Sequence, residues 1–160
     1  MISLDFLEQV EVFKELGDDQ LAAVRNLCQE AGYRRDDKIF GAREEPLFLW
    51  AVIEGEVVLK LQLPESSPLN NDTIATLSPG MTFGWSSLVP PSEYSLSAYC
   101  SSRRCKVLKV GRKDLTDLFE KDAELGYLVM SKIVSVVGYR FHQLREEIIK
   151  SIGHDIINRW

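Results

Sequence analysis

The residues best suited to chemistry lie in the stretch 78–88, which reads SPGMTFGWSSL. A short strand there runs into Gly84 and then into small hydroxyl residues. Backbone N–H groups in such a turn can converge on one point and hold a phosphate or another anion. Tyr94 and Ser95 follow within a further strand-like run and can reach the same neighbourhood. The sequence therefore indicates a binding turn.

The same stretch gives little support for catalysis or for a metal. Ser86 and Ser87 have no histidine nearby that could activate a nucleophile. A metal site inside a β-barrel would need several histidines, and the two present, His142 and His154, fall in the helical C-terminal region. No glycine-rich nucleotide motif of the Walker or dinucleotide type is present. We expect no enzyme activity, no metal and no cofactor.

Composition further limits the classes of protein to which the chain can belong. The chain has 160 residues, 24 acidic and 19 basic, and a net charge of −5, which argues against a large nucleic-acid footprint. No apolar run approaches the roughly 20 residues that span a bilayer, and the N-terminus MISLD does not look like a signal peptide. We expect a cytoplasmic protein with no membrane partner.

Three cysteines make an odd set, which argues against a disulfide framework. Cys100 and Cys105 are close in sequence. They are either small core residues or a redox or metal pair.

Two elements are predicted before the strands, within a helical segment over residues 4–31. Ser3 can cap a helix over 4–16, which Gly17 ends. An acidic pair caps a second helix that closes at Gly32. From residue 33 to 110, short apolar runs alternate with turn residues, as in an all-β barrel or sandwich. We predict strands at 39–40, 47–53, 57–63, 73–77, 82–83, 94–100 and 105–110, with Gly55 in a turn and a polar loop over 64–72.

The C-terminal helices are predicted over 112–160. One helix spans 112–120, and Asp122 can cap a long helix from 123 to about 150, before Gly153 interrupts it and a last short turn follows. Its apolar residues form two heptad rows, Met130, Val137 and Leu144 in one and Val134, Phe141 and Ile148 in the other.

These rows either pack on the chain's own strands or form a dimer seam. We favour the seam for the distal half, because a helix of about 28 residues is about 42 Å long and outruns a domain of this size. The sequence thus predicts a homodimer.

The order of a hairpin, a Pro-Gly-x-x-Phe-Gly turn, a small-residue run, a strand and a long helix resembles the cyclic-nucleotide-binding domain of the catabolite activator and protein kinase A regulatory families. The resemblance covers roughly residues 10–150 and includes Gly55, Pro79-Gly80 and Phe83-Gly84. It implies one mainly β domain over residues 1–160, a jelly roll (double-stranded β-helix) flanked by N-terminal helices and a long C-terminal helix. It also implies dimerisation through that helix. Only ten residues follow Lys150, so we expect no direct DNA binding by this chain.

In that family the phosphate-binding cassette reads Phe-Gly-Glu, then small residues, then an Arg followed by a small residue about eight positions later. The Glu accepts a hydrogen bond from the ribose, and the Arg pairs with the cyclic phosphate. Here Trp85 stands at the Glu position, and Tyr94 or Ser95 stands at the Arg position. The residues that match are Phe83, Gly84, Ser86, Ser87 and Leu88.

These departures weaken the case for a cyclic nucleotide. A lost charge-assisted contact costs roughly 1.5–3 kcal/mol. With the ribose acceptor also gone, we expect affinity to fall on the order of a hundredfold. The ligand site, residues 83–88 with Tyr94 and Ser95, then takes another anionic or aromatic small molecule, or Trp85 plugs it. We predict a ligand-sensing regulatory module that signals through its C-terminal helix. The alternative is a dimerisation scaffold with a plugged pocket.

Overall fold

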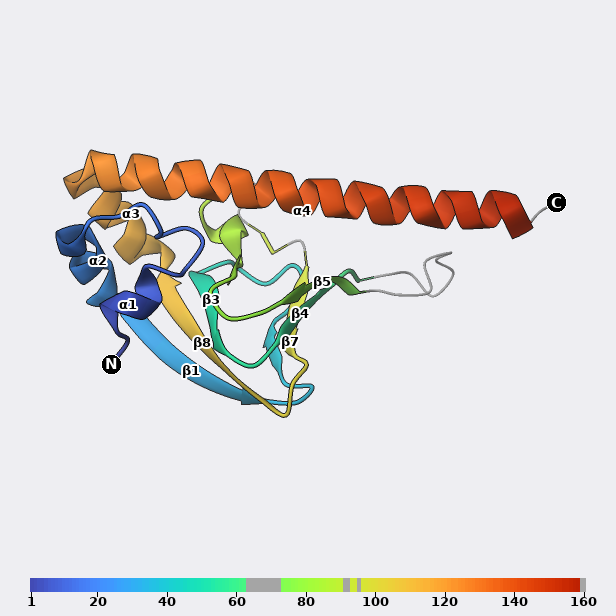
Figure 1. Ribbon diagram of the computed structural model, residues 1–160, viewed down its shortest axis with the longest axis horizontal. Helices are drawn as coiled ribbons and strands as arrows, with labels where there is room; N and C mark the ends of the chain where they lie inside the picture. Colours follow the sequence, from blue (N-terminus) through green and yellow to red (C-terminus); the bar gives the residue numbers. More distant parts are fainter. Residues whose placement is uncertain (63–72, 91–92, 95, 159–160) are drawn as a thin grey trace.

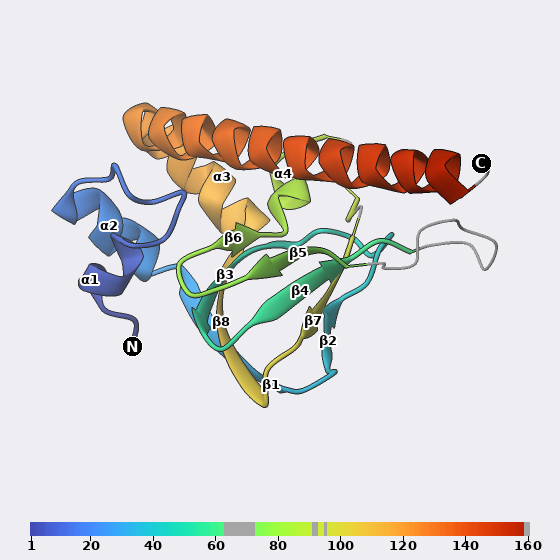
Figure 2. The ribbon, with the colours of Figure 1, turned by 45° about the vertical axis from the view of Figure 1, so that its right-hand side comes forward.

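Two antiparallel sheets face each other in the computed structural model, which describes residues 1–62, 73–90, 93–94 and 96–158 (Figure 1). The first sheet has the order β1 (Cys28–Arg34), β8 (Arg104–Gly111), β3 (Phe48–Glu54) and β6 (Thr82–Phe83). The second has the order β2 (Lys38–Phe40), β7 (Ser97–Cys100), β4 (Val57–Lys60) and β5 (Thr73–Leu77). This is the predicted jelly roll, and its described strands form two sheets rather than one closed barrel (Figure 2).

Side chains of β3 show how the first sheet separates two cores. Leu49 and Ala51 point to one face and Trp50 and Val52 to the other, as the two-residue period of a strand requires. The face with Trp50 packs on the second sheet, and we call this the inner core. The face with Leu49 packs on the helices, and we call this the outer core. Because both faces are buried, β3 is apolar throughout its middle.

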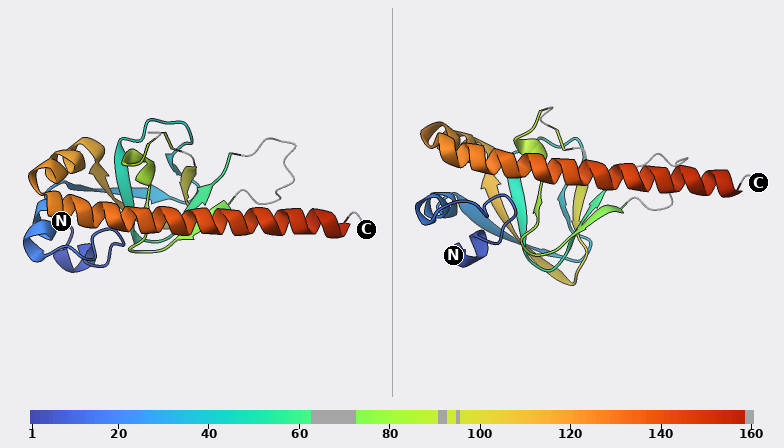
Figure 3. Two further views of the ribbon diagram at one scale, coloured as in Figure 1. Left: turned by 90° about the horizontal axis from the view of Figure 1, so that it is seen from above. Right: turned by 45° about the horizontal axis from the view of Figure 1, so that its top comes forward.

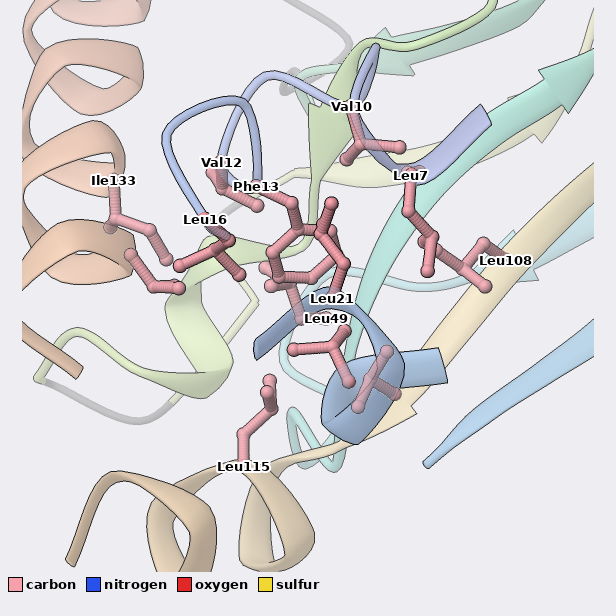
Figure 4. Packing of buried hydrophobic residues seen from close by; sticks show 14 of the residues in the cluster. Leu7, Val10, Val12, Phe13, Leu16, Leu21, Leu49, Leu108, Leu115 and Ile133 are labelled. Atoms are coloured by element: carbon pink, nitrogen blue, oxygen red, sulfur yellow. The ribbon is translucent and has the colours of Figure 1, made fainter. Parts of the chain in front are cut away.

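The outer core joins all the long helices to the first sheet. They are α2 (Asp18–Arg25), α3 (Arg112–Lys121) and α4 (Ala123–Asn158), preceded by the short α1 (Leu4–Leu7). Figure 4 shows Ile133 of α4 pointing toward Val12 and Leu16 of the N-terminal segment. The buried members of the outer core are Ile2, Leu7, Val10, Val12, Phe13, Leu16, Leu21, Val24, Leu49, Ala51, Leu108, Val110, Leu115, Leu125, Val129, Ile133 and Val136.

Most of the predicted strands are confirmed to within a residue or two, with two exceptions. The run predicted at 94–100 is a strand only over Ser97–Cys100, and the run predicted at 57–63 ends as a strand at Lys60. Gly55 lies in the predicted turn with φ +80°. Residues 64–72, predicted as a polar loop, lie outside the described residues.

The predicted second helix is wrong at its C-terminal end. It stops at Arg25, and Cys28–Arg34 form β1 instead, paired along its length with β8 from Cys28↔Val110 to Arg34↔Arg104. The sequence Gln29-Glu30-Ala31 favours a helix locally, but every residue from 28 to 34 pairs in register with a residue of β8, and this long-range ladder decides the structure. Glu30 also forms an ion pair with Lys106 across the ladder, at 3.1 Å.

The first predicted helix is also shorter than expected. Ser3 caps it as predicted, with its Oγ accepting from the Phe6 N–H at 3.1 Å, but α1 ends at Leu7. Single turns then carry Val10, Phe13 and Leu16 into the outer core. The apolar spacing correctly marked which residues are buried, although a regular helix does not present them.

Helix α4 runs unbroken for 36 residues along the top of the molecule (Figure 1). The predicted interruption at Gly153 is wrong, because a single glycine with open space around its Cα weakens a helix without ending it. Views from two further directions show the C-terminal turns of α4 extending past the strands (Figure 3). Asp122 caps α4 as predicted, since its Oδ1 accepts from the Leu125 N–H at 3.0 Å.

Asp122→Ala should lower the free energy of unfolding by about 1 kcal/mol, because the Leu125 N–H then loses its acceptor. Denaturant unfolding measures the change. Asp122→Asn keeps a side-chain acceptor and should lose clearly less. Equal stability of the Ala variant and the wild type would show that the cap contributes nothing.

Candidate functional site

The predicted binding turn, residues 83–88, is built around Gly84. Gly84 ends β6 with φ +69° and begins the short 3₁₀ helix η1 (Trp85–Ser87). A Cβ at Gly84 would lie 2.5 Å from Trp50 Cδ1, so the close approach to the inner core requires glycine here. The turn is closed by the Leu88 N–H, which donates to the Trp85 carbonyl at 2.9 Å.

The predicted ligand residues separate into two groups. Phe83 and Tyr94 are buried in the inner core, between the sheets. Trp85 and Leu88 pack instead against the outer core, on the side of α4. Ser86 and Ser87, between Trp85 and Leu88 in the sequence, are buried, and Ser95 lies outside the described residues.

Tyr94, not Trp85, fills the space between the sheets. Its ring stacks on Phe40 with 3.8 Å between centroids and 14° between planes. Phe40 in turn lies 5.9 Å from Phe83, and Trp50 lies 6.1 Å from Phe83. Trp85, the predicted plug, packs against the outer core, since β6 ends with Phe83 facing the inner core.

Hydrogen bonds fix Tyr94 in this position. Trp50 Nε1 donates to the Tyr94 hydroxyl at 3.1 Å, and that hydroxyl donates to the Phe48 carbonyl at 3.0 Å. The Arg43 N–H donates to the Tyr94 carbonyl at 2.9 Å. Arg43 has φ +72°, a conformation that a residue with a Cβ adopts at a cost, so the backbone contact at Tyr94 is maintained against local strain.

The electrostatics of the inner core favour neutral groups. Burial raises the pKa of Tyr94, which therefore remains a neutral hydrogen-bond donor at physiological pH. Burial also raises the pKa of Cys105 to about 12, next to Cys100. Both cysteines are buried core residues, consistent with the simpler of the two predictions for them. Among the described residues, no cluster of three or more His, Cys, Asp or Glu could hold a metal.

Helix α4 has two faces. Leu125, Val129, Ile133 and Val136 are buried in the outer core, which makes this the docked face. The opposite side carries an exposed apolar row of Tyr127, Val134, Phe141 and Ile148, spaced by seven residues. No described helix, α4 included, is long and apolar enough to cross a membrane.

The predicted seam is divided between these faces. Val134, Phe141 and Ile148 belong to the exposed row. Met130 and Val137 are half-buried against the outer core, and Leu144 is also half-buried. Sequence reasoning missed Tyr127, Ile152 and Ile156, which extend the exposed row at both ends, although their spacing could have revealed them.

Several solved structures share this architecture. A candidate cyclic-nucleotide-binding protein of Geobacter metallireducens GS-15 is 27% identical, with a TM-score of 0.74 over 89% of this chain and 100% of that one. A cyclic-nucleotide-binding domain of Methylobacillus flagellatus KT is 19% identical, with a TM-score of 0.77 over 92% and 80% of the two chains. The catabolite activator protein of Thermus thermophilus is 23% identical, with a TM-score of 0.70 over 86% and 61%.

The chain has the fold of a cyclic-nucleotide-binding domain. The resemblance found in the sequence is thereby confirmed, although no family model and no curated protein matches the sequence. In this cyclic-nucleotide-binding fold, the turn after β6 keeps its glycine. The side chains beside it are the rings of Phe83 and Trp85 and the hydroxyls of Ser86 and Ser87.

Tyr94→Phe should lower the free energy of unfolding by about 2 kcal/mol, because the Trp50 N–H and the Phe48 carbonyl then lack a partner inside the protein. Urea unfolding followed by Trp fluorescence measures the loss. Tyr127→Phe, which removes an exposed hydroxyl, serves as the control and should be neutral. A neutral Tyr94→Phe would mean that the hydroxyl contributes no net stability.

Proposed function

We propose that this chain is a non-catalytic, cytoplasmic regulatory module that senses a small molecule and signals through α4 as a homodimer. The observation that carries the proposal is the exposed apolar row of α4. Val134 is 69% exposed and Phe141 is 67% exposed, on a helix whose other face is docked. Covering one such side chain contributes roughly 1.5–3 kcal/mol, so the row favours a partner.

A second copy of the chain suits this row best. Side chains repeating every seven residues present a straight seam to an identical helix, and a two-fold axis makes the two rows self-complementary. The C-terminal turns, with the exposed Ile148, Ile152 and Ile156, extend beyond the described strands. Isolated helical turns of this length are marginal in water, and pairing would stabilise them.

Contacts between the turn and α4 supply a route for the signal. Trp85 and Leu88 pack against the outer core, to which Val129 and Ile133 of α4 also belong. A ligand that moved η1 would therefore change the surface on which α4 docks. Such a ligand shifts the position of α4 only to the extent that it binds one arrangement better than the other.

A scaffold without a ligand is the second candidate. The filled inner core favours it, since Phe40, Trp50, Phe83 and Tyr94 are within stacking distance of one another beside the turn. In that case the fold contributes only its dimer seam, and Tyr94 takes the place of a ligand.

The double variant Val134→Glu, Phe141→Glu should be monomeric in sedimentation velocity at concentrations where the wild type is a dimer, because four glutamates would face one another in the seam. The control is the double variant Ser135→Glu, His142→Glu, which adds the same charge beside the exposed row. It should still form the dimer. Unchanged association of the double variant would exclude this seam.

Ligand titration separates the sensor from the scaffold. A true ligand at a hundred times its dissociation constant stabilises the fold by about 2.7 kcal/mol. We expect no stabilisation by micromolar cyclic AMP or cyclic GMP, and a shift of the melting curve with at least one member of a panel of aromatic acids and other anionic metabolites. Saturation by micromolar cyclic AMP would contradict the expected loss of affinity, and a panel with no effect would favour the scaffold.

A further inference from the structure

Arg140 is a buried cation on the docked face of α4. It is 6% exposed, and its Nη1 donates to Gln143 Oε1 at 3.1 Å. Its other two nitrogens, Nε and Nη2, are buried and have no hydrogen-bond partner among the described residues. Leaving buried donors of a charged group unpaired is expensive, so native structures rarely do so without a reason.

The two free nitrogens lie on the same edge of the guanidinium. Nε and Nη2 direct their hydrogens to one side in parallel, which is the geometry that binds two oxygens of a carboxylate or phosphate. Gln143 occupies only Nη1 and leaves this edge open. An oxyanion with two adjacent acceptors therefore matches what Arg140 lacks.

Charged groups of the N-terminal segment lie near this part of α4. Lys132 forms an ion pair with Glu15 at 2.9 Å, and the charge of Glu11 acts on Arg140 two turns further along α4. The Glu11 carboxylate is itself held by the Thr82 N–H, at 2.8 Å. Thr82 Oγ1, on the same residue of β6, is also buried without a partner among the described residues.

Two other partners for Arg140 are less suitable. A second copy of the chain would meet the exposed row, whereas Arg140 lies on the docked face among outer-core neighbours such as Val136. Glu11 lies nearby but forms no ion pair with Arg140, and Thr82 holds its carboxylate. The described residues thus offer no acceptor for the free edge.

We propose that Arg140 anchors an oxyanion-binding site between α4 and β6, with Thr82 Oγ1 as a further donor and a phosphate or carboxylate group as the occupant. The site deepens the proposed sensing role and rests on it. It would place the cation for the ligand on the signalling helix, in a chain whose turn has Trp85 and Tyr94 where a relative would have an acid and a cation. Both free nitrogens are covered by protein in the arrangement shown, so the oxyanion enters as α4 shifts at this point. Binding of the oxyanion and the position of α4 are thereby coupled.

The test compares wild type, Arg140→Met and Arg145→Met by thermal shift and calorimetry. Arg145 lies on the same helix, and its side chain is 56% exposed, so its variant is matched for charge. Inorganic phosphate, 5′-AMP and cyclic AMP are titrated at constant ionic strength against chloride. We expect at least one phosphate-bearing probe to raise the melting temperature of wild type and Arg145→Met. Arg140→Met should bind that probe at least tenfold more weakly.

Comparison of the three probes also identifies the source of the oxyanion. A response to inorganic phosphate indicates a free anion, and a response to a nucleotide alone indicates a phosphate carried by a larger ligand. Without any anion, Arg140→Met should melt higher than wild type, because a buried unpaired charge is replaced by an apolar chain. This second readout does not depend on choosing the right probe.

Glu11→Gln separates an external oxyanion from an internal ion pair. Removing that negative charge should strengthen phosphate binding if an anion occupies the site. The proposal is overturned if Arg140→Met responds like wild type, if wild type responds to none of the probes, or if Glu11→Gln and Arg140→Met both destabilise the protein as partners would. Sedimentation of the same samples reports the dimer independently, so a monomer that binds phosphate through Arg140 would contradict the proposed function alone.

Discussion

Leu125, Val129 and Ile133 hold helix α4 on the body by entering the same core as Leu49 and Ala51 of β3. This contact depends on the first sheet, whose other face is covered by the second sheet through Trp50 and Val52. A sheet that is buried on both faces can pass a displacement from one core to the other. Close-packed interiors respond to a change of side-chain volume by shifting as units. The positions of the turn after β6 and of helix α4 therefore both depend on the first sheet.

The inner core is stably packed, and this packing leaves less space for a ligand. Stacked rings and the Trp50–Tyr94–Phe48 hydrogen bonds give it a rigid, satisfied interior. The same rings pack beside Gly84, where an added Cβ would lie 2.5 Å from Trp50 Cδ1. A ligand at this turn, as proposed above, would displace a ring or bind at a different surface. The proposed Arg140 site is such a surface, because Arg140 is buried on the docked face of α4 and away from the exposed row.

Sequence patterns predicted those parts of the fold that local rules determine. The alternation at Leu49 to Val52, the glycine at 84 and the cap at Asp122 each follow from the geometry of a single element. The strand at Cys28–Arg34 escaped prediction because its stability comes from β8, seventy residues away. The packing of Trp85 against the outer core could not be predicted for a related reason. Position in a motif identifies a turn, but the direction of a side chain depends on which strand precedes it.

Arg140 could not have been singled out from the sequence. An arginine on an amphipathic helix is normally solvated, whereas this one is buried on the docked face of α4. The exposed row was readable in part, since Val134, Phe141 and Ile148 follow a heptad. The sequence did not show that Met130 and Val137 are separate from this row, because that depends on the outer core against which those two residues pack.

Amide hydrogen exchange along α4 at a series of protein concentrations tests the central claim most directly. If the docked half is held by the body and the distal half by a second copy, residues 125–137 are protected equally at every concentration. Protection over 145–157 then rises as the protein is concentrated. Distal protection that does not change on dilution would contradict this account of α4, and so would fast exchange there at all concentrations.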